Sequence, residues 1–283
     1  MHIGSAGSNF KTWNNIAQSS ILVSIDANNS SVNSKRKFKK VINDQVIISN
    51  KNKFGKFYLT HDPNCSSLLE PDKSVHQNWY LSHRIKIKKI HKKKIYSLNN
   101  FLKLRNINYI DWFVTDVQGK DLDIIKSLKK NIKNKISIID IEAGFFSFYK
   151  KSDKISDVFN YMSKNYDFED MEFGFNYKLS SKGLSKIEKK ILFKYNKPSK
   201  IYSNIIFLNK KKNVERINLL KLIYLVENNK TFEARQLITS ISKNNVFYNR
   251  ILQELEFIIK IQKFKFLILS PFFLINKFIS FFK

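Results

Sequence analysis

The sequence predicts an α/β protein with a mainly parallel sheet and a helical C-terminal appendage. In the first half of the chain, short runs rich in β-branched residues alternate with helical patterns. The strand runs are almost continuously apolar, as expected when helices cover both faces of a parallel sheet. From about Asn213 onward only helical periodicity is present. We therefore expect a first domain over 1–210 and an appendage over 211–283.

The order of the expected elements supports this division. Strands are expected at 21–26, 46–50, 56–60, 84–90, 110–116 and 136–142, and helices at 10–19, 97–106 and 120–133. In the helix 120–133, Leu122, Ile125, Leu128 and Ile132 fall on one face and lysines fill the other, which is typical of a crossover helix packed on a sheet. A further helix is expected near 153–165, followed by strands near 168–177 and 203–208.

Composition excludes several classes of protein. The chain has 283 residues, of which 43% are hydrophobic, so it can bury a large core and is not disordered. Its single cysteine, Cys65, excludes an internal disulfide and multi-cysteine metal sites, which favours a reducing compartment. The first residues lack the pattern of a signal peptide, and no run reaches the ~20 apolar residues of a membrane span. These features predict a cytoplasmic protein.

The formal net charge of +28 does not by itself indicate a partner. Only six of the 51 basic residues are arginine, and the abundant Lys, Asn, Ile and Phe share A/T-rich codons. Proteins that read nucleic acids rely on the planar fork of arginine. We expect no specific nucleic-acid partner, although nonspecific, salt-sensitive binding to anionic polymers stays open.

A turn rich in small residues opens the chain. Gly4, Ser5 and Gly7 lie in this turn, and the strand 21–26 ends in Asp26, 22 positions after Gly4. Such a turn lets backbone approach a nucleoside-type ligand, and an acid at this distance accepts hydrogen bonds from ribose hydroxyls. Short glycine-rich turns also occur by chance. Because a third glycine and a Walker lysine are missing, a cofactor without phosphates, such as S-adenosylmethionine (SAM), fits better than a nucleotide.

Two acids follow apolar strands at the edge where open α/β sheets bind ligands. Asp116 begins the run Asp-Val-Gln-Gly after the strand 110–116, and it is the first candidate for a catalytic base or for orienting the acceptor. Its alternative role is to cap the next helix. Glu142 is the second candidate, and Asp140 lies on the same side of its strand. Both could instead be ordinary solvent-facing carboxylates.

The segment 58–72 is dense in turn residues and in groups that hydrogen-bond hydroxyls. The candidate substrate-binding residues in it are His61, Asp62, Ser66 and Ser67. His61 could also be a base or an ordinary surface residue, and no positioned histidine partner supports Cys65 as a nucleophile. No metal site is expected.

Together these blocks resemble the FkbM-type SAM-dependent methyltransferases. The resemblance rests on the turn 2–8 with Trp13, on Asp26, on the loop 59–72, on Asp-Val-Gln-Gly with its apolar helix (116–128), and on the segments 138–149, 157–162 and 202–208. It covers roughly residues 2–210 and implies a Rossmann-like methyltransferase sheet. Two departures stand out: His2 occupies a position where members usually carry an acid, and Gln118 one where many carry Glu. The first strand is also short, which leaves open an upstream start or a reduced cofactor wall.

The resemblance implies a SAM-dependent O-methyltransferase that acts on a hydroxyl of a glycan or a glycan-like acceptor. In this interpretation Gly4, Ser5, Gly7 and Asp26 hold SAM. Two other classes stay open: a noncatalytic SAM-fold binding protein and a basic nucleic-acid-binding protein. The oligomeric state is not predicted.

The C-terminal segment 264–283 is rich in Phe, Leu and Ile, with Pro271 inside it. It could pack on the appendage or on a second subunit. Alternatively it lies in a membrane interface, with its lysines toward anionic head groups and the enzyme beside lipid-linked acceptors.

Overall fold

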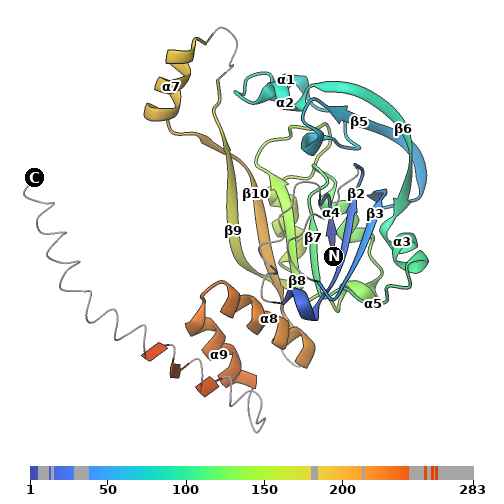
Figure 1. The fold of residues 1–283 in the computed structure, drawn as a ribbon, viewed down its shortest axis with the longest axis vertical. Coiled ribbons are helices and arrows are strands. Elements are labelled where there is room, and N and C mark those ends of the chain that lie inside the picture. The colour runs from blue at the N-terminus through green and yellow to red at the C-terminus, as the bar shows by residue number, and fades with distance from the viewer. Residues whose placement is uncertain are drawn as a thin grey trace, which may run out of the picture. The chain divides into compact units, whose positions relative to one another are not determined.

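The computed structural model describes residues 1–5, 13, 16–28, 38–179, 184–211, 214–241, 252–253, 256–257 and 259–260. The chain divides into two compact units, Met1–Lys211 and Lys212–Lys283. Figure 1 shows the fold of the first unit, a sheet with helices packed on it. The segment 264–283 lies outside the described residues.

The first unit is built around a seven-stranded sheet, which confirms the predicted α/β class. Its strands are β1 (His2–Ile3), β2 (Ile21–Asp26), β3 (Lys40–Gln45), β7 (Trp112–Thr115), β8 (Ile138–Gly144), β9 (Tyr166–Asn176) and β10 (Ser199–Asn209). They lie in the order β3-β2-β1-β7-β8-β10-β9. The first five are parallel, and β10 is antiparallel to both β8 and β9. The order reverses direction between β1 and β7, where ligands of open α/β sheets bind.

The short strand β1 occupies the centre of this sheet. It pairs in parallel with β2 and with β7. The N–H of Val114 donates to the carbonyl of Met1, and the N–H of Asp116 donates to that of Ile3, at 2.9 and 3.0 Å. The two residues of β1 therefore join the two halves of the sheet at the point where the strand order reverses.

Three strands form a separate sheet in the order β4-β6-β5 (Figure 1). They are β4 (Ile47–Ser49), β5 (Lys53–Thr60) and β6 (Ile87–Ser97). The sequence pattern does not distinguish these strands from those of the central sheet. The physical difference is that β5 and β6 pair antiparallel and leave most of their side chains in solvent, whereas a central strand is buried on both faces.

The first unit also contains helices between its strands. They are η2 (Ala17–Ser19), η3 (Pro63–Cys65), α1 (Lys73–His76), α2 (Ser82–Ile85), α3 (Leu98–Leu104), α4 (Asp121–Ser127), α5 (Lys130–Lys133), α6 (Ile155–Met162) and α7 (Lys186–Tyr195). The prediction of a single helix over 120–133 was wrong. The backbone leaves the helical conformation at Leu128 and Lys129, where ψ is 136° and 139°, and this break separates α4 from α5.

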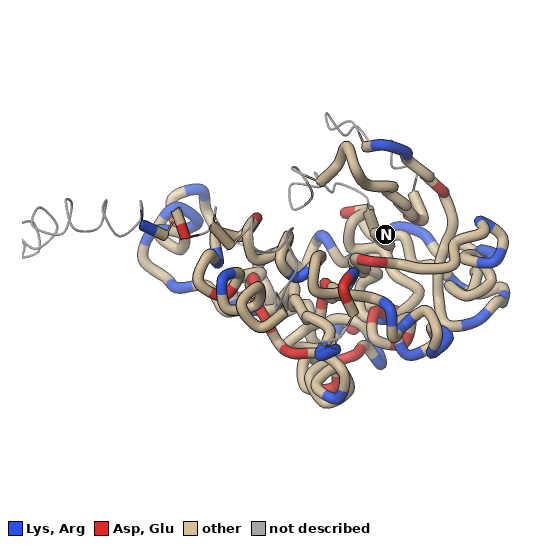
Figure 2. The backbone as a smooth tube through the Cα atoms, turned by 90° about the horizontal axis from the view of Figure 1, so that it is seen from below, with Lys and Arg blue, Asp and Glu red and all other residues tan. Residues whose placement is uncertain are grey.

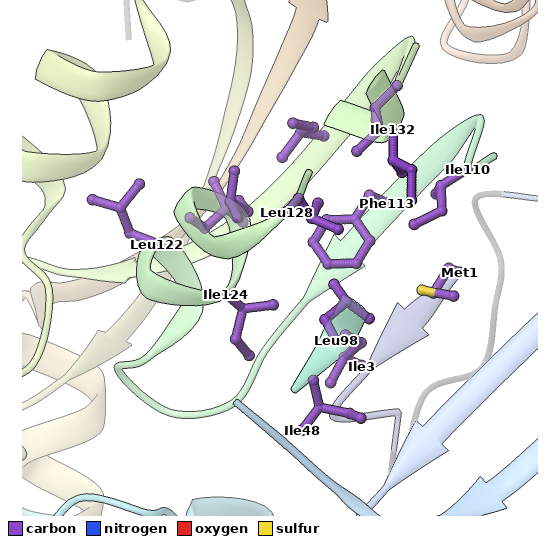
Figure 3. Close-up of a cluster of buried hydrophobic side chains, with 14 of the residues drawn as sticks. Met1, Ile3, Ile48, Leu98, Ile110, Phe113, Leu122, Ile124, Leu128 and Ile132 are labelled. Carbon is purple, nitrogen blue, oxygen red and sulfur yellow. The ribbon is translucent and has the colours of Figure 1, made fainter. Parts of the chain in front are cut away.

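The apolar face expected for this segment is nevertheless buried in the main core. Leu122, Ile125, Leu128 and Ile132 all belong to this core, and Figure 3 shows Leu128 close to Phe113 of β7. Each such side chain contributes about 1.5 to 3 kcal/mol when fully buried. The core thus fixes α4, and with it the turn that precedes α4.

The second unit contains α8 (Glu215–Glu227) and α9 (Thr231–Ile241). The prediction of a helical appendage over the whole of 211–283 stays a prediction, because much of this range lies outside the described residues. In the part of the chain that the structure describes, the helices are all too short or too polar to cross a bilayer.

Candidate functional site

Two neighbouring cavities lie at the carboxyl ends of the central parallel strands. The smaller is lined by the ends of β1 and β2, by residues 46–48 and by part of the loop 63–68. The larger, of about 210 Å³, is lined by residues of α1, α2, β8 and the segment 144–153. Asn64, Asp116 and Gln118 line both cavities. These three residues therefore form the boundary between the two spaces.

Gly4 is required by the backbone at the smaller cavity. Its φ is +77°, and a Cβ at this position would lie 1.7 Å from the carbonyl oxygen of Asp116. Its N–H donates to the carbonyl of Ile25 at 2.9 Å. Only glycine allows the two chain segments to approach this closely.

The other residues predicted to hold a cofactor differ in their positions. Asp26 ends β2, lines the smaller cavity and accepts a 2.7 Å hydrogen bond from the N–H of Asn28. Ser5 is buried, and its hydroxyl lies 2.7 Å from that of Ser24, so it is not among the residues that line either cavity. Gly7 lies outside the described residues.

The turn after β7 has an unusual backbone. Gln118 and Gly119 both have positive φ, +60° and +101°. The buried carboxylate of Asp121 holds this turn, because it accepts hydrogen bonds from the N–H groups of Val117 and Gly119 and from the hydroxyl of Thr115. Asp121, not Asp116, therefore takes up the free N–H groups before α4. The carboxyl group of Asp116 is left for another role.

Asp116 and Glu142 are joined through one amide. The Nε2 of Gln118 donates to Oδ1 of Asp116 at 2.6 Å and to Oε1 of Glu142 at 3.1 Å. The hydroxyl of Tyr149 lies 3.0 Å from Oε1 of the same amide and 2.7 Å from the carbonyl of Cys65, and it can donate to either. The structure thus brings together the two predicted catalytic acids, with Gln118 between them.

Burial governs the protonation of these acids. It raises the pKa of Asp116 to about 7, and the nearby charge of Asp121 adds to the effect. Burial, followed by the charge of Asp116, also raises the pKa of Glu142 well above its usual value. Because each charge opposes the other, the pair holds a proton near neutral pH. Asp140 does not line either cavity, although burial raises its pKa to about 7.

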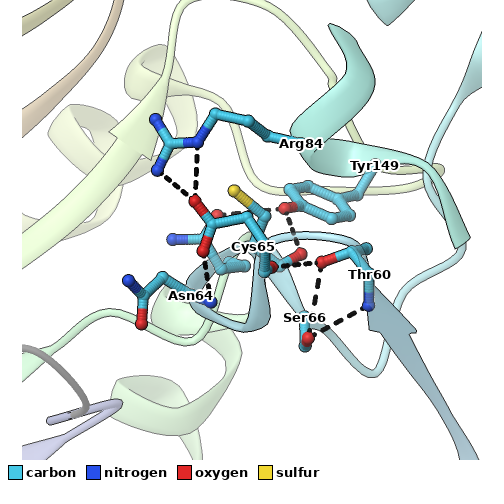
Figure 4. A network of polar contacts seen from close by, with 8 residues as sticks. Thr60, Asn64, Cys65, Ser66, Arg84 and Tyr149 are labelled. Carbon is cyan, nitrogen blue, oxygen red and sulfur yellow. Dashed lines mark hydrogen bonds and ion pairs between the residues drawn. The ribbon is translucent and has the colours of Figure 1, made fainter. Parts of the chain in front are cut away.

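The loop 59–72 is attached to this turn and lines both cavities. The hydroxyl of Ser67 donates to the carbonyl of Gln118 at 2.9 Å, and the hydroxyl of Ser66 accepts from the N–H of Thr60 at 3.2 Å. Both serines line the smaller cavity. Figure 4 shows the hydrogen bonds between Thr60 and Ser66, with Arg84 and Tyr149 nearby. The two serines position the loop at the boundary between the cavities.

Asp62 connects the same loop to α2. Its carboxylate caps η3 through the N–H of Asn64 and forms an ion pair with Arg84, whose Nε lies 2.6 Å from Oδ2. Burial would raise the pKa of Asp62, but the hydrogen bonds from Arg84 and from the Asn64 N–H outweigh this and lower it. Arg84 lines the larger cavity, whereas Asp62 does not.

His61 and Cys65 show no catalytic arrangement. The side chain of His61 is exposed, and His61 does not line either cavity. Burial raises the pKa of the Cys65 thiol to about 11, so this thiol stays protonated at neutral pH. No group of three or more His, Cys, Asp and Glu side chains suited to a metal ion occurs among the described residues.

Aromatic side chains form much of the wall of the larger cavity. They are Trp79, Phe146, Phe148, Tyr149 and Tyr202. The ring of Trp79 contacts those of Phe146 and Phe148, with centroids 5.0 and 5.6 Å away. Polar groups also line this cavity, including buried His76, whose Nδ1 has no hydrogen-bond partner. The cavity can therefore hold a ligand that has both apolar faces and hydrogen-bonding groups.

In the sequence, Gln118 stood out only because many FkbM-type proteins carry Glu at this position. Tyr149, Arg84 and Trp79 were not among the predicted site residues. The sequence signal for Gln118 was its position between two acids at strand ends, Asp116 two residues before it and Glu142 after it. Arg84 and Trp79 come from the segment between β5 and β6, and no spacing in the sequence connects that segment to β7 or β8.

Comparison with protein-family models matches residues 2–170 to the methyltransferase FkbM domain. Comparison with the curated proteins and with the solved structures found no significant match. The family match spans more than half of the chain, and it covers Gly4, Asp26, Asp116 and Glu142. The chain therefore belongs to the FkbM methyltransferase domain family.

Proposed function

We propose that this protein transfers the methyl group of SAM to a hydroxyl oxygen of a glycan or glycan-like acceptor. The observation that carries the proposal is that Asp116, with its pKa near 7, lines both cavities. In this assignment the smaller cavity takes the cofactor and the larger takes the acceptor. The acidic pair then lies at their boundary.

The residues of the smaller cavity fit SAM. The close packing of Gly4 on the Asp116 backbone brings the end of β1 to the cavity, and Asp26 offers carboxylate oxygens to ribose hydroxyls. Ile47, Phe57 and Leu68 provide apolar walls suited to an adenine ring. When bound, SAM supplies an electrophilic methyl group.

Asp116 is the proposed general base. A carboxyl group with a pKa near 7 can accept a proton from a hydroxyl at neutral pH, which is the condition for efficient base catalysis. Gln118 fixes the orientation of this carboxyl group, and Glu142 retains the proton that the pair shares. Orientation of the acceptor oxygen at the boundary supplies much of the remaining rate enhancement.

The larger cavity supports a sugar-like acceptor. Its aromatic rings can pack on the apolar faces of a sugar ring, and Arg84, His76 and Asn176 offer groups that hydrogen-bond hydroxyls. We also propose that the catalytic part is residues 1–210 and that 211–283 forms a helical appendage, which α8 and α9 support.

The test uses full-length protein, SAM labelled on its methyl carbon, and a panel of neutral and acidic oligosaccharides. We expect label in the oligosaccharide fraction that survives alkaline hydrolysis, because a methyl ether is stable to base and a methyl ester is not. The Asp116→Asn variant should transfer at least about 100-fold less label.

The matched control is Asp153→Asn, which also exchanges an acid for an amide at the larger cavity but does not line the smaller one. Base-labile label would contradict transfer to a hydroxyl. Binding of S-adenosylhomocysteine without any transfer across the panel would favour the noncatalytic binding protein. If the protein binds neither SAM nor S-adenosylhomocysteine, the assignment of the smaller cavity is wrong.

A further inference from the structure

Strands β5 and β6 form an antiparallel pair that we call the basic ribbon, residues 53–60 and 87–97. Basic residues occur throughout the described chain (Figure 2), so their number alone indicates no partner. The ribbon is distinct because it carries seven lysines and no Asp or Glu. Among the described residues, the lysines of the ribbon form no ion pair.

The register of the ribbon places like charges opposite each other. Lys56 lies directly across from Lys92, and Lys94, two residues further on the same face, lies across from Phe54. Like charges in opposite positions destabilise a strand pair. An anion bound between them would remove this repulsion. The face is also accessible, since Phe54 is 66% and Ile90 is 50% exposed.

One end of the ribbon reaches the larger cavity. Beyond the last ribbon pair, the N–H of His61 donates to the carbonyl of Lys86 at 2.9 Å, and the N–H of Asp62 donates to that of Arg84 at 3.0 Å. Arg84 and Asn64, which follow these connections, both line the cavity. A long ligand that leaves the cavity at this edge would therefore continue along the lysines.

We propose that the basic ribbon binds an anionic polysaccharide chain while one unit of the same chain occupies the larger cavity. This inference rests on the proposed function, because it takes that cavity as the acceptor site. Same-face residues of a strand recur every 6.4 to 6.8 Å, so Lys92 and Lys94 offer a periodic row of cations. Such a row attracts a polyanion and releases its counterions.

The composition of the ribbon favours a polysaccharide over two other polyanionic surfaces. Arginine, which recognises bases and phosphates in a bidentate manner, is absent from the ribbon. Phe54 and Ile90 are separated by lysines and form no continuous apolar face of the kind that inserts into a lipid interface.

The experiment measures binding of full-length protein to polygalacturonate, with neutral dextran of similar length as the uncharged probe. The ribbon variant is Lys56→Gln/Lys92→Gln/Lys94→Gln. The control variant, Lys103→Gln/Lys129→Gln/Lys130→Gln, removes the same charge from exposed lysines on and near α3 and α5. We expect the ribbon variant to bind polygalacturonate at least 10-fold more weakly, with a smaller dependence on salt, and the control to change less than 2-fold.

Two results would overturn the proposal: equal losses in both triple variants, or tighter binding of the wild type to single-stranded DNA or to phosphatidylglycerol vesicles than to polygalacturonate. Titration with S-adenosylhomocysteine on the same samples separates this outcome from failure of the proposed function. All three proteins should bind it within 2-fold of one another. Loss of polygalacturonate binding with intact S-adenosylhomocysteine binding places the effect in the ribbon alone.

Discussion

At the smaller cavity the main chain of neighbouring strand ends packs closely, whereas at the larger cavity side chains from separate segments are joined by polar contacts. At the smaller cavity, Gly4 contacts the backbone of Asp116, and Asp26 ends the neighbouring strand. At the larger, the amide of Gln118 joins side chains from β8 and from the loop after it. The smaller cavity thus depends on close packing of the main chain, and the larger depends on polar contacts between residues far apart in the sequence.

The largest effect that this comparison predicts is that of Gly4→Ala. The new methyl group would collide with the Asp116 carbonyl, and φ would stay positive. We expect a loss of about 2 to 5 kcal/mol in the free energy of unfolding, from overpacking and backbone strain together. Urea denaturation measures it.

Gly55→Ala serves as the control, since its Cβ would meet the ends of the Ile95 and Lys53 side chains and no backbone atom. Equal destabilisation by the two substitutions would show that the junction at Gly4 is not specially constrained.

The second prediction concerns Asp116→Asn, which tests the acid at the boundary between the two cavities. We expect the wild-type turnover to rise with pH through a midpoint near 7, because only the carboxylate accepts a proton. The variant should lose about 100-fold in turnover and lose this midpoint, with S-adenosylhomocysteine affinity within 3-fold. A pH–rate profile that is the same in both proteins would remove Asp116 from the chemistry.

The same substitution has a predicted effect on stability. Because the pKa of Asp116 in the folded protein lies above its ordinary value of 3.8, the folded state binds more protons than the unfolded state between about pH 4 and 7. Stability from this acid is therefore present below pH 4 and lost as the pH rises through 7. Thermal unfolding should show that Asp116→Asn raises Tm at pH 8 relative to wild type and changes it less at pH 4.

The two cavities also differ in how far their residues can be predicted from the sequence. Gly4 and Asp26 could be identified because a small-residue turn and the end of the next strand lie 22 residues apart in the sequence. Asp116 and Glu142 could be named because both follow apolar strands. The contact of Tyr149 with Gln118 spans 31 residues, and that of Arg84 with Asp62 depends on the path of a separate sheet. Local patterns do not encode such tertiary contacts, and the apolar periodicity of 120–133 did not reveal the break at Leu128.

A third prediction sharpens the role of the central amide. Gln118→Glu replaces a donor with a third carboxyl group beside Asp116 and Glu142. Like charges raise the pKa of neighbouring carboxyl groups. We expect the midpoint of the pH–rate profile to move upward by about one unit, with little change in S-adenosylhomocysteine affinity. A midpoint that stays in place or moves downward would mean that Gln118 does not control the ionisation of Asp116.

The smallest expected effect is that of Asp62→Asn, at the rim of the larger cavity. The partner side chain, that of Arg84, is 42% exposed, so solvent screens the pair and the loss of stability should be below about 1 kcal/mol. Because the pKa of Asp62 is lowered by folding, this contribution is present at neutral pH and is lost as the pH falls below about 4. Urea denaturation at pH 7 and pH 3 measures both. A larger loss at pH 3 than at pH 7 would contradict the account.

The assignment of the two cavities is tested most directly by calorimetric titration of S-adenosylhomocysteine into a pair of matched variants, Asp26→Asn and Asp153→Asn. Each changes an acid to its amide, the first at the smaller cavity and the second at the larger. The account predicts that Asp26→Asn weakens binding by about 10-fold or more, since buried hydroxyls lose a charged acceptor. It also predicts that Asp153→Asn leaves the affinity within 2-fold. Equal weakening in both variants, or weakening in Asp153→Asn alone, would contradict it.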